Sequence, residues 1–175
     1  MVESLLDFAR MESGRQVYHT EVWEPAELVR DIVEEFREQA FAGASRVELA
    51  GLAQGYQVRV DREAFTRAIW NLIDNAVKYS PATSPVRVSV LARDRHVAIA
   101  VEDQGAGIPE REHREILRKF VRGSAAQAMH VKGTGIGLAM VHHIVKAHGG
   151  RLEVESGTGR GSRFTILLPA AKEPA

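Results

Sequence analysis

The stretch KGTGIGLAMVHHIVKAHGG, residues 132–150, places Gly133, Gly135 and Gly137 at alternate positions in front of an apolar run. Glycines spaced in this way leave backbone N–H groups unshielded at the mouth of a following helix, where the helix dipole favours an anion. A phosphate group is the natural ligand for such a site. Because Gly-rich stretches also form ordinary turns and hinges, the rest of the sequence must decide between the two.

The composition is that of an ordinary globular domain. A chain of 175 residues, 45% apolar and 26% charged, can bury a core without metal or disulfide support. Lys plus Arg equals Asp plus Glu at 23 each, so no overall charge attracts nucleic acid or an acidic membrane surface. The chain has no cysteine, which excludes a disulfide scaffold, a thiolate zinc site and a Cys nucleophile. Any anion site must therefore be local, and we expect no nucleic-acid partner.

The hydropathy pattern predicts neither a membrane segment nor an export signal. No apolar run approaches the roughly 20 residues that span a bilayer. The N-terminal MVESLLDFARMESGR lacks the basic start and long apolar centre of a signal peptide. We therefore expect this chain to make no membrane contact and to be cytoplasmic.

Two long helices are predicted from the 3.6-residue period. Pro25 opens the first, over residues 25–40, with one apolar face. Asp61 is the expected N-cap of the second, which runs from Arg62 to about Tyr79 and is ended by Ser80 and Pro81.

Four strands are predicted to form two antiparallel hairpins. VRVSVLA and HVAIAVED alternate apolar with polar residues around RDR, and RLEVES and SRFTILLP flank GTGRG. VELA and YQVRV predict two further short strands. The element order predicts an α+β fold, a two-layer α/β sandwich of a mixed sheet with helices on one face.

The N-terminal residues resemble the end of a helix. Val2, Leu5, Leu6 and Ala9 form one apolar stripe, and Gly14 is a stop signal. So short a helix is not stable alone, so we expect it to pack on a neighbouring chain or back onto the domain near Trp23. The predicted boundaries are a helix end at 1–14, a polar linker at 15–24, a domain at 25–170 and a tail at 171–175.

The helix segment NLIDNAVKY, residues 71–79, has a second, polar face. Asn71, Asn75 and Lys78 lie along one ridge beside the core stripe, which could be a plain solvated surface. An Asn carbonyl oxygen is also a suitable ligand for Mg²⁺, which takes its other ligands from waters and phosphates. Lys78, one turn on, can meet a terminal phosphate. The core stripe of the helix consists of Phe65, Ile69, Leu72 and Ala76.

The stretch DQGAGIP, residues 103–109, follows a predicted strand. Asp103 at the strand end can accept a hydrogen bond from an amino group such as that of adenine, and Gly105 and Gly107 let the chain turn closely beneath a ring. Taken alone, the stretch could equally be a Gly-rich turn capped by Asp.

In their order and separation these segments resemble the ATP-binding domain of bacterial sensor histidine kinases, in the group that includes DNA gyrase, Hsp90 and MutL. NLIDNAVKYS resembles the N box, DQGAGIP the first glycine box, ILRKFVRG the F box, and KGTGIGLAMVHHIVKAHGG the second glycine box. GRLEVESGTGRGSRFTILLP resembles the closing hairpin. The resemblance covers nearly all of residues 15–170 and implies a Bergerat-type fold that binds ATP with Mg²⁺.

The resemblance also implies roles for individual residues. Asn75 would coordinate Mg²⁺ with Asn71 beside it, and Asp103 would receive the adenine amino group. The residues implied in phosphoryl transfer are Asn71, Lys78 and Arg122. Those implied in nucleotide binding are Asn71, Asn75, Lys78, Tyr79, Asp103, Gly105, Gly107, Ile108, Lys132, Gly133, Thr134, Gly135, Ile136, Gly137, Leu138, and Ser162 or Thr165 through water.

One departure from the family pattern concerns the F box. Arg118 and Lys119 precede Phe120, and Val121 follows it, where the family usually has an acidic and an aromatic residue. The segment 122–132 has few large apolar residues, so we expect it to be mobile without nucleotide.

A larger departure is the missing phosphoacceptor, since no histidine of the chain stands in a His-acid-Pro motif. EHREI around His113 is the nearest imitation, and we interpret it as a solvated helix start. We therefore expect a kinase fragment that begins after its own acceptor, with residues 1–14 ending the second helix of the acceptor hairpin. The implied partners are that helical hairpin and, indirectly, a response regulator. The full-length protein would be a homodimer, with any inner-membrane anchor upstream.

Other classes of protein fit less well. The glycine spacing fails a Rossmann site because Leu138 stands where Gly or Ala is wanted, and no Gly-Lys-Ser/Thr of a P-loop occurs. Hydrolytic relatives carry Glu at the first N-box position, here Asn71, so transfer is favoured over hydrolysis. Two alternatives remain: a nucleotide-binding regulatory module without transfer, and an anti-sigma-factor-type serine kinase.

Overall fold

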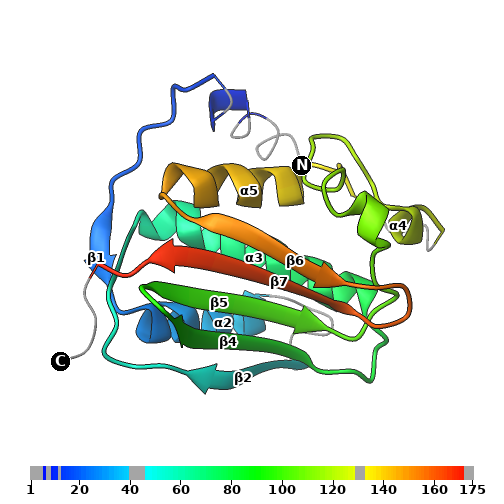
Figure 1. The fold of residues 1–175 in the computed structure, drawn as a ribbon, viewed down its shortest axis with the longest axis horizontal. Helices are drawn as coiled ribbons and strands as arrows, with labels where there is room; N and C mark the ends of the chain where they lie inside the picture. The colour runs from blue at the N-terminus through cyan, green and yellow to red at the C-terminus, as the bar shows by residue number, and fades with distance from the viewer. Residues whose placement is uncertain (1–5, 7–8, 12, 40–45, 129–132, 172–175) are drawn as a thin grey trace.

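The fold is a two-layer sandwich, with three helices behind one face of a five-stranded sheet (Figure 1). The computed structural model describes residues 6, 9–11, 13–39, 46–128 and 133–171. The helices of this layer are α2 (Pro25–Gln39), α3 (Arg62–Tyr79) and α5 (Gly137–Ala147). The strands are β2 (Val47–Leu52), β4 (Val86–Arg93), β5 (His96–Asp103), β6 (Arg151–Ser156) and β7 (Ser162–Pro169). The predicted α+β fold is confirmed.

The sheet is mixed, as predicted. Its strand order is β2-β4-β5-β7-β6, in which β2 runs parallel to β4 and every other neighbouring pair is antiparallel. Both predicted hairpins form, and Asp94 takes a φ of 53° in the β4–β5 turn, a conformation that Asp tolerates. The central strand β5 pairs Asp103 at its end with Ser162 at the start of β7. This pairing sets the position of both side chains.

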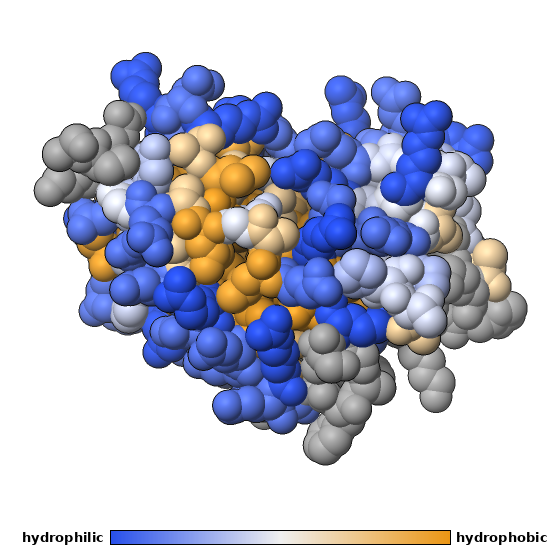
Figure 2. All heavy atoms as spheres, turned by 90° about the horizontal axis from the view of Figure 1, so that it is seen from below, coloured by the Kyte–Doolittle hydropathy of each residue, from blue (hydrophilic) through white to orange (hydrophobic). Residues whose placement is uncertain are grey.

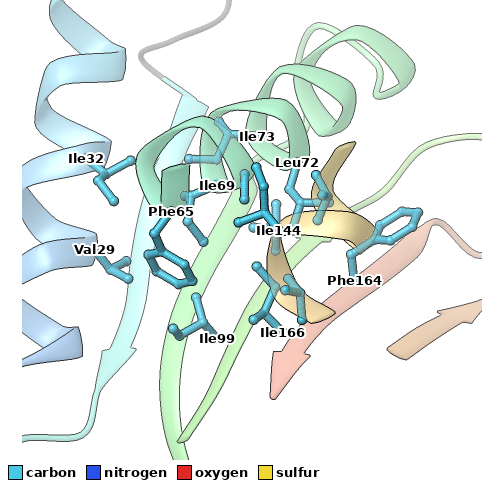
Figure 3. Packing of buried hydrophobic residues seen from close by; sticks show 14 of the residues in the cluster. Val29, Ile32, Phe65, Ile69, Leu72, Ile73, Ile99, Ile144, Phe164 and Ile166 are labelled. Carbon is cyan, nitrogen blue, oxygen red and sulfur yellow. The ribbon is translucent and has the colours of Figure 1, made fainter. Parts of the chain in front are cut away.

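Helix α3 forms as the sequence predicts. The Asp61 side chain caps it by accepting a hydrogen bond from the Ala64 N–H at 3.0 Å. Its predicted core stripe is buried, and in Figure 3 Phe65 on α3 points toward Ile99 on β5. Ile144 of α5 lies near Ile166 of β7 in the same layer. Burying one face of α3 turns its polar face away from the sheet.

The core reaches the surface at one edge of the sandwich. Figure 2 looks from the side on which β2 lies and shows apolar residues surrounded by hydrophilic ones. Within β2 itself, Leu49 and Leu52 are only partly buried, and the pairing with β4 is irregular between them. The edge strand therefore closes the apolar layer incompletely.

A second, two-stranded sheet was not predicted. β1 (Glu21–Trp23), within the stretch predicted to be a linker, pairs antiparallel with β3 (Val58–Val60), which lies in the predicted strand YQVRV. Three residues are too few to show an alternation in the sequence. The guanidinium of Arg62 lies 5.6 Å from the ring centre of Trp23 and holds this sheet to the start of α3.

Residues before β1 also pack on the domain. Met11 is 2% exposed and belongs to the hydrophobic core, whereas Leu6 is exposed. The Tyr18 ring meets the His148 ring edge-on at 5.0 Å, and the Asp61 carboxylate accepts a hydrogen bond from the His19 N–H at 2.7 Å. At Met11, the predicted helix end therefore packs back onto the domain. Val2 and Leu5 lie outside the described residues, and the predicted domain boundaries stay predictions.

Between β5 and α5 the chain forms two short helices. One is a 3₁₀ helix, Glu110–Glu112, which ends just before His113, so the helix start predicted around His113 is wrong: residues 113–117 form turns. The other is α4 (Ser124–Ala128), where the sequence predicted no helix. Part of the segment predicted to be mobile, residues 129–132, lies outside the described residues, and its mobility stays a prediction. Within the described residues no helix is both long and apolar enough to cross a membrane.

Candidate functional site

A cavity of about 200 Å³ lies between α3, the loop after β5 and the start of α5. It brings together most of the predicted site residues from segments far apart in the sequence. The predicted residues that line it are Asn71, Asn75, Lys78, Tyr79, Asp103, Gly107, Ile108, Arg122, Gly133, Thr134, Gly135, Gly137, Leu138 and Ser162.

The polar face of α3 forms one wall of the cavity. The Asn71 side-chain amide donates to the Arg67 carbonyl at 2.9 Å and contacts the Met140 sulfur of α5 at 3.8 Å. These contacts fix the amide and turn its oxygen toward Gly137, where a Cβ would lie only 2.8 Å from it. A side chain at position 137 would therefore displace the Asn71 amide from this position.

The N-terminus of α5 faces the cavity. Helix α5 begins at Gly137, so its first unpaired backbone N–H groups lie at the cavity mouth and favour an anion. The preceding Gly135 has a φ of +71°, and its carbonyl accepts a hydrogen bond from the Phe120 N–H at 2.9 Å. A Cβ at Gly135 would lie 2.9 Å from the Phe120 carbonyl carbon. Glycine thus lets the two segments touch backbone to backbone.

Asp103 supplies a buried acceptor to the cavity. The residue is 8% exposed, and its Oδ1 accepts a hydrogen bond from the Gly105 N–H at 2.7 Å. Burial raises the pKa of the Asp103 carboxyl, and hydrogen bonds from the backbone N–H groups of Gly105 and Ser162 oppose that shift. A carboxylate held in this way suits a ligand that donates N–H groups.

The loop after β5 is built on close backbone contacts. A Cβ at Gly105 would lie 2.4 Å from the Tyr79 carbonyl oxygen, and one at Gly107, whose φ is +71°, would lie 1.9 Å from that of Gly157. The Ser156 hydroxyl accepts from the Ile108 N–H and donates to the Gly161 carbonyl, both at 2.8 Å. These contacts lock the loop that carries the wall of the cavity.

Three predicted site residues do not line the cavity. Gly105 packs against the backbone of Tyr79, and Ile136 is buried in the core. Thr165 lies three positions after Ser162 on β7 and therefore faces the other side of the sheet. This corrects the choice between the two: only Ser162 lines the cavity. Lys132 lies outside the described residues.

Several residues that line the cavity were not predicted from the sequence. Asp74 lies on the same face of α3 as Asn71 and Lys78 and could have been found from helix periodicity. Glu112 accepts a hydrogen bond from the Ser124 N–H at 2.9 Å, and this contact lowers its pKa. No local pattern signals Glu112, because its partner comes from α4. The remaining missed residues are Ala106, Ile116, Val121, Gly123 and Phe164.

The donor set fits a ligand with an anionic end and a ring bearing an amino group. Amide oxygens and an ammonium group come from α3, backbone N–H groups from the start of α5, and the Asp103 acceptor from the end of β5. No cluster of three or more His, Cys, Asp or Glu side chains suited to a metal occurs among the described residues. A metal here would depend on Asn oxygens and on oxygens of the ligand, which is the coordination that Mg²⁺ accepts.

Comparison with known proteins shows which family the chain belongs to. Residues 60–172 match the family model described as histidine kinase-, DNA gyrase B-, and HSP90-like ATPase. The chain is 38% identical over 174 residues to the signal transduction histidine-protein kinase/phosphatase MprB of Mycobacterium sp. (strain KMS), covering 97% of this chain and 32% of the relative. It is 30% identical to the sensor-like histidine kinase SenX3 of Mycolicibacterium smegmatis, covering 99% of this chain and 45% of the relative.

Solved structures give the same result. A mycobacterial sensor histidine kinase MprB structure superposes with a TM-score of 0.73 at 30% identity, covering 90% of this chain and all of that one. Full-length ShkA in complex with AMPPNP gives a TM-score of 0.81 at 24% identity, which shows the fold alone, and covers 99% of this chain and 36% of that one. The chain thus spans less than half the length of the curated relatives described above. The family model covers more than half of the chain, which therefore belongs to the family of histidine kinase-, DNA gyrase B-, and HSP90-like ATPases.

Proposed function

We propose that the chain is the catalytic domain of a sensor histidine kinase, which binds ATP with Mg²⁺ and transfers the γ-phosphoryl group to a histidine on a separate helical hairpin. The observation that carries the proposal is a single cavity in which the buried Asp103 acceptor shares the lining with Asn71, Asn75 and Lys78. ATP needs both kinds of group in one cavity: an acceptor for the adenine amino group, and metal-binding and cationic groups for the triphosphate. Family membership supports ATP as the nucleotide.

Each wall has a role in this proposal. Asp103 accepts a hydrogen bond from the adenine amino group, Asn75 offers its amide oxygen to Mg²⁺, and Lys78 binds a phosphate oxygen. Arg122, half-buried in the cavity wall, is the second cation at the phosphate end. When bound, Mg²⁺ would neutralise part of the negative charge of the phosphates. The chain's own contribution is to hold the nucleotide and to offer the backbone N–H groups of α5 to its phosphates.

The proposal favours transfer over hydrolysis. Asn71 carries no proton-accepting carboxylate, and its amide nitrogen is already bound to the Arg67 carbonyl. The side chain therefore cannot activate a water as a general base. In the transfer the bond from the γ-phosphorus to the bridging oxygen breaks, a bond from phosphorus to an imidazole nitrogen forms, and ADP leaves.

The proposed partners are the acceptor hairpin and, through it, a response regulator. The exposed Leu6, on the predicted apolar stripe, supports a helix that continues into a hairpin and a homodimeric full-length protein. We place the domain in the cytoplasm, where ATP is available, with any membrane anchor in upstream segments.

Replacing Asn75 with Ala should raise the Kd for Mg-ATP by at least about tenfold, because one metal ligand is removed. Asn75 lies off the core stripe of α3, so the thermal unfolding midpoint should change little. Isothermal titration with and without EDTA checks this, since the effect should vanish without metal. Undiminished Mg-ATP affinity in the variant would remove Asn75 from the metal site.

Replacing Asp103 with Asn should weaken the preference for ATP over GTP, since an amide can present a donor where adenine needs an acceptor. The raised pKa of Asp103 adds a pH signature. As the pH falls through that pKa, Asp103 gains a proton and becomes a weaker acceptor that also presents a donor, so ATP affinity should decline in wild type but not in Asp103→Asn. Titrations with both nucleotides, from neutral pH downward, measure this. An equal ATP preference in both proteins would show that another group selects the base.

A further inference from the structure

One charged side chain at the phosphate end of the cavity has no role in the proposed function. Asp74 lies on α3 one residue before Asn75, and its side chain is 44% exposed. It forms an ion pair with Lys78, one turn further along the helix, and both residues line the cavity. Lys78, the cation expected to bind phosphate, is therefore already paired with the Asp74 carboxylate.

The positive charge of Lys78 is balanced by Asp74, with which it forms an ion pair on the cavity-lining face of α3. Free ATP brings about four negative charges at neutral pH, whereas its magnesium complex brings about two. Asp74 therefore opposes the free nucleotide more strongly than the complex, because the repulsion scales with the uncompensated charge of the ligand.

We propose that Asp74 is a specificity-determining residue that makes the site select metal-complexed nucleotide over free nucleotide. This inference rests on the proposed function. With free ATP, Lys78 must leave Asp74, which then faces phosphate charge that nothing compensates. With the metal complex, Asp74 faces a cation held beside Asn75, and Lys78 exchanges one anion for another without leaving an unbalanced charge.

A second ion pair on α3 serves as a control for a purely structural role of the Asp74–Lys78 pair. Glu63 and Arg67 form an ion pair of the same i, i+4 spacing, with a distance of 3.2 Å, and neither residue lines the cavity. If the Asp74–Lys78 pair only supported the helix, Glu63→Gln and Asp74→Asn would have similar effects on nucleotide binding.

The test measures the Kd for ATP by isothermal titration, in excess Mg²⁺ and in EDTA, on the whole chain. Asp74→Asn should lower the Kd in EDTA by about tenfold and change the Kd for Mg-ATP by less than about threefold. Asp74→Glu should keep the wild-type ratio of the two constants, and Glu63→Gln should match wild type. Thermal unfolding midpoints of all four proteins check that the fold is retained.

Two results would overturn the inference and leave the proposed function standing. One is an unchanged Kd in EDTA for Asp74→Asn, which together with a weaker Kd for Mg-ATP would make Asp74 a metal ligand instead. The other is an equal fall of the Kd in EDTA and in Mg²⁺, which would mean that Asp74 does not distinguish the two forms of the nucleotide. Failure of wild type to bind ATP in either condition would overturn the proposed function, and this inference with it.

Discussion

Replacing Gly161 with Ala should lower the free energy of unfolding by about 3–5 kcal/mol, a large stability effect for a single methyl group. Gly161 has a φ of +72°, and a Cβ there would lie 2.1 Å from the Asp103 carbonyl oxygen and 3.0 Å from the Gln104 Cα. Both neighbours are backbone atoms, so no side chain can move aside. Urea unfolding followed by circular dichroism measures the loss.

Gly159 provides a matched control in the same turn. Its φ is +74°, but a Cβ there would meet nothing within 4 Å. Gly159→Ala should therefore cost only the conformational penalty, about 1 kcal/mol. Equal losses at the two positions would show that the turn shifts to relieve the contact. Gly161→Ala should also weaken ATP binding, because Asp103 must move.

The second large effect expected is phosphoryl transfer to an added helical hairpin, by a chain that does not label itself. Radiolabelled ATP should not label the chain alone, because no histidine stands in an acceptor motif. Adding the matching helical hairpin in trans should give labelled hairpin, with the acid lability of a phosphoramidate. A hairpin that lacks its histidine is the control and should stay unlabelled.

The same experiment separates the alternatives. ATP binding with no label on any hairpin favours a regulatory module, and acid-stable label on serine favours a serine kinase. Label on His113 would mean that the chain is a self-contained kinase. His113 is a poor candidate because it is half-buried and its Nε2 lies 3.1 Å from the Ile108 carbonyl oxygen, to which it donates in the matching tautomer.

Features that depend on local sequence were predictable. The Asp61 cap, the core stripe of α3 and the polar ridge from Asn71 to Lys78 all follow from residues within a few turns of one another. The two hairpins follow from alternation and turn residues. Because the cavity wall on α3 is one face of one helix, its residues could be named before the fold was known.

Features that depend on a distant partner were not predictable. The strand β1 is three residues long and exists because β3, more than thirty residues later, pairs with it. The five-residue α4 is too short to be stable on its own pattern, and a hydrogen bond between Ser124 and Glu112 supports its first residue. Likewise, the sequence GTGRG predicts a turn but does not reveal which glycine touches Asp103.

The pairing of β5 with β7 has a consequence for how the protein is made. The two strands are neighbours in the sheet, yet residues 104–161 lie between their paired ends. Closing a loop of that length costs roughly 3–4 kcal/mol of chain entropy, so this pairing should follow the local β4–β5 hairpin during folding. Asp103 gains its Ser162 neighbour only at that step. A nascent chain therefore has no complete nucleotide site until β7 has left the ribosome, however early α3 and its asparagines have folded.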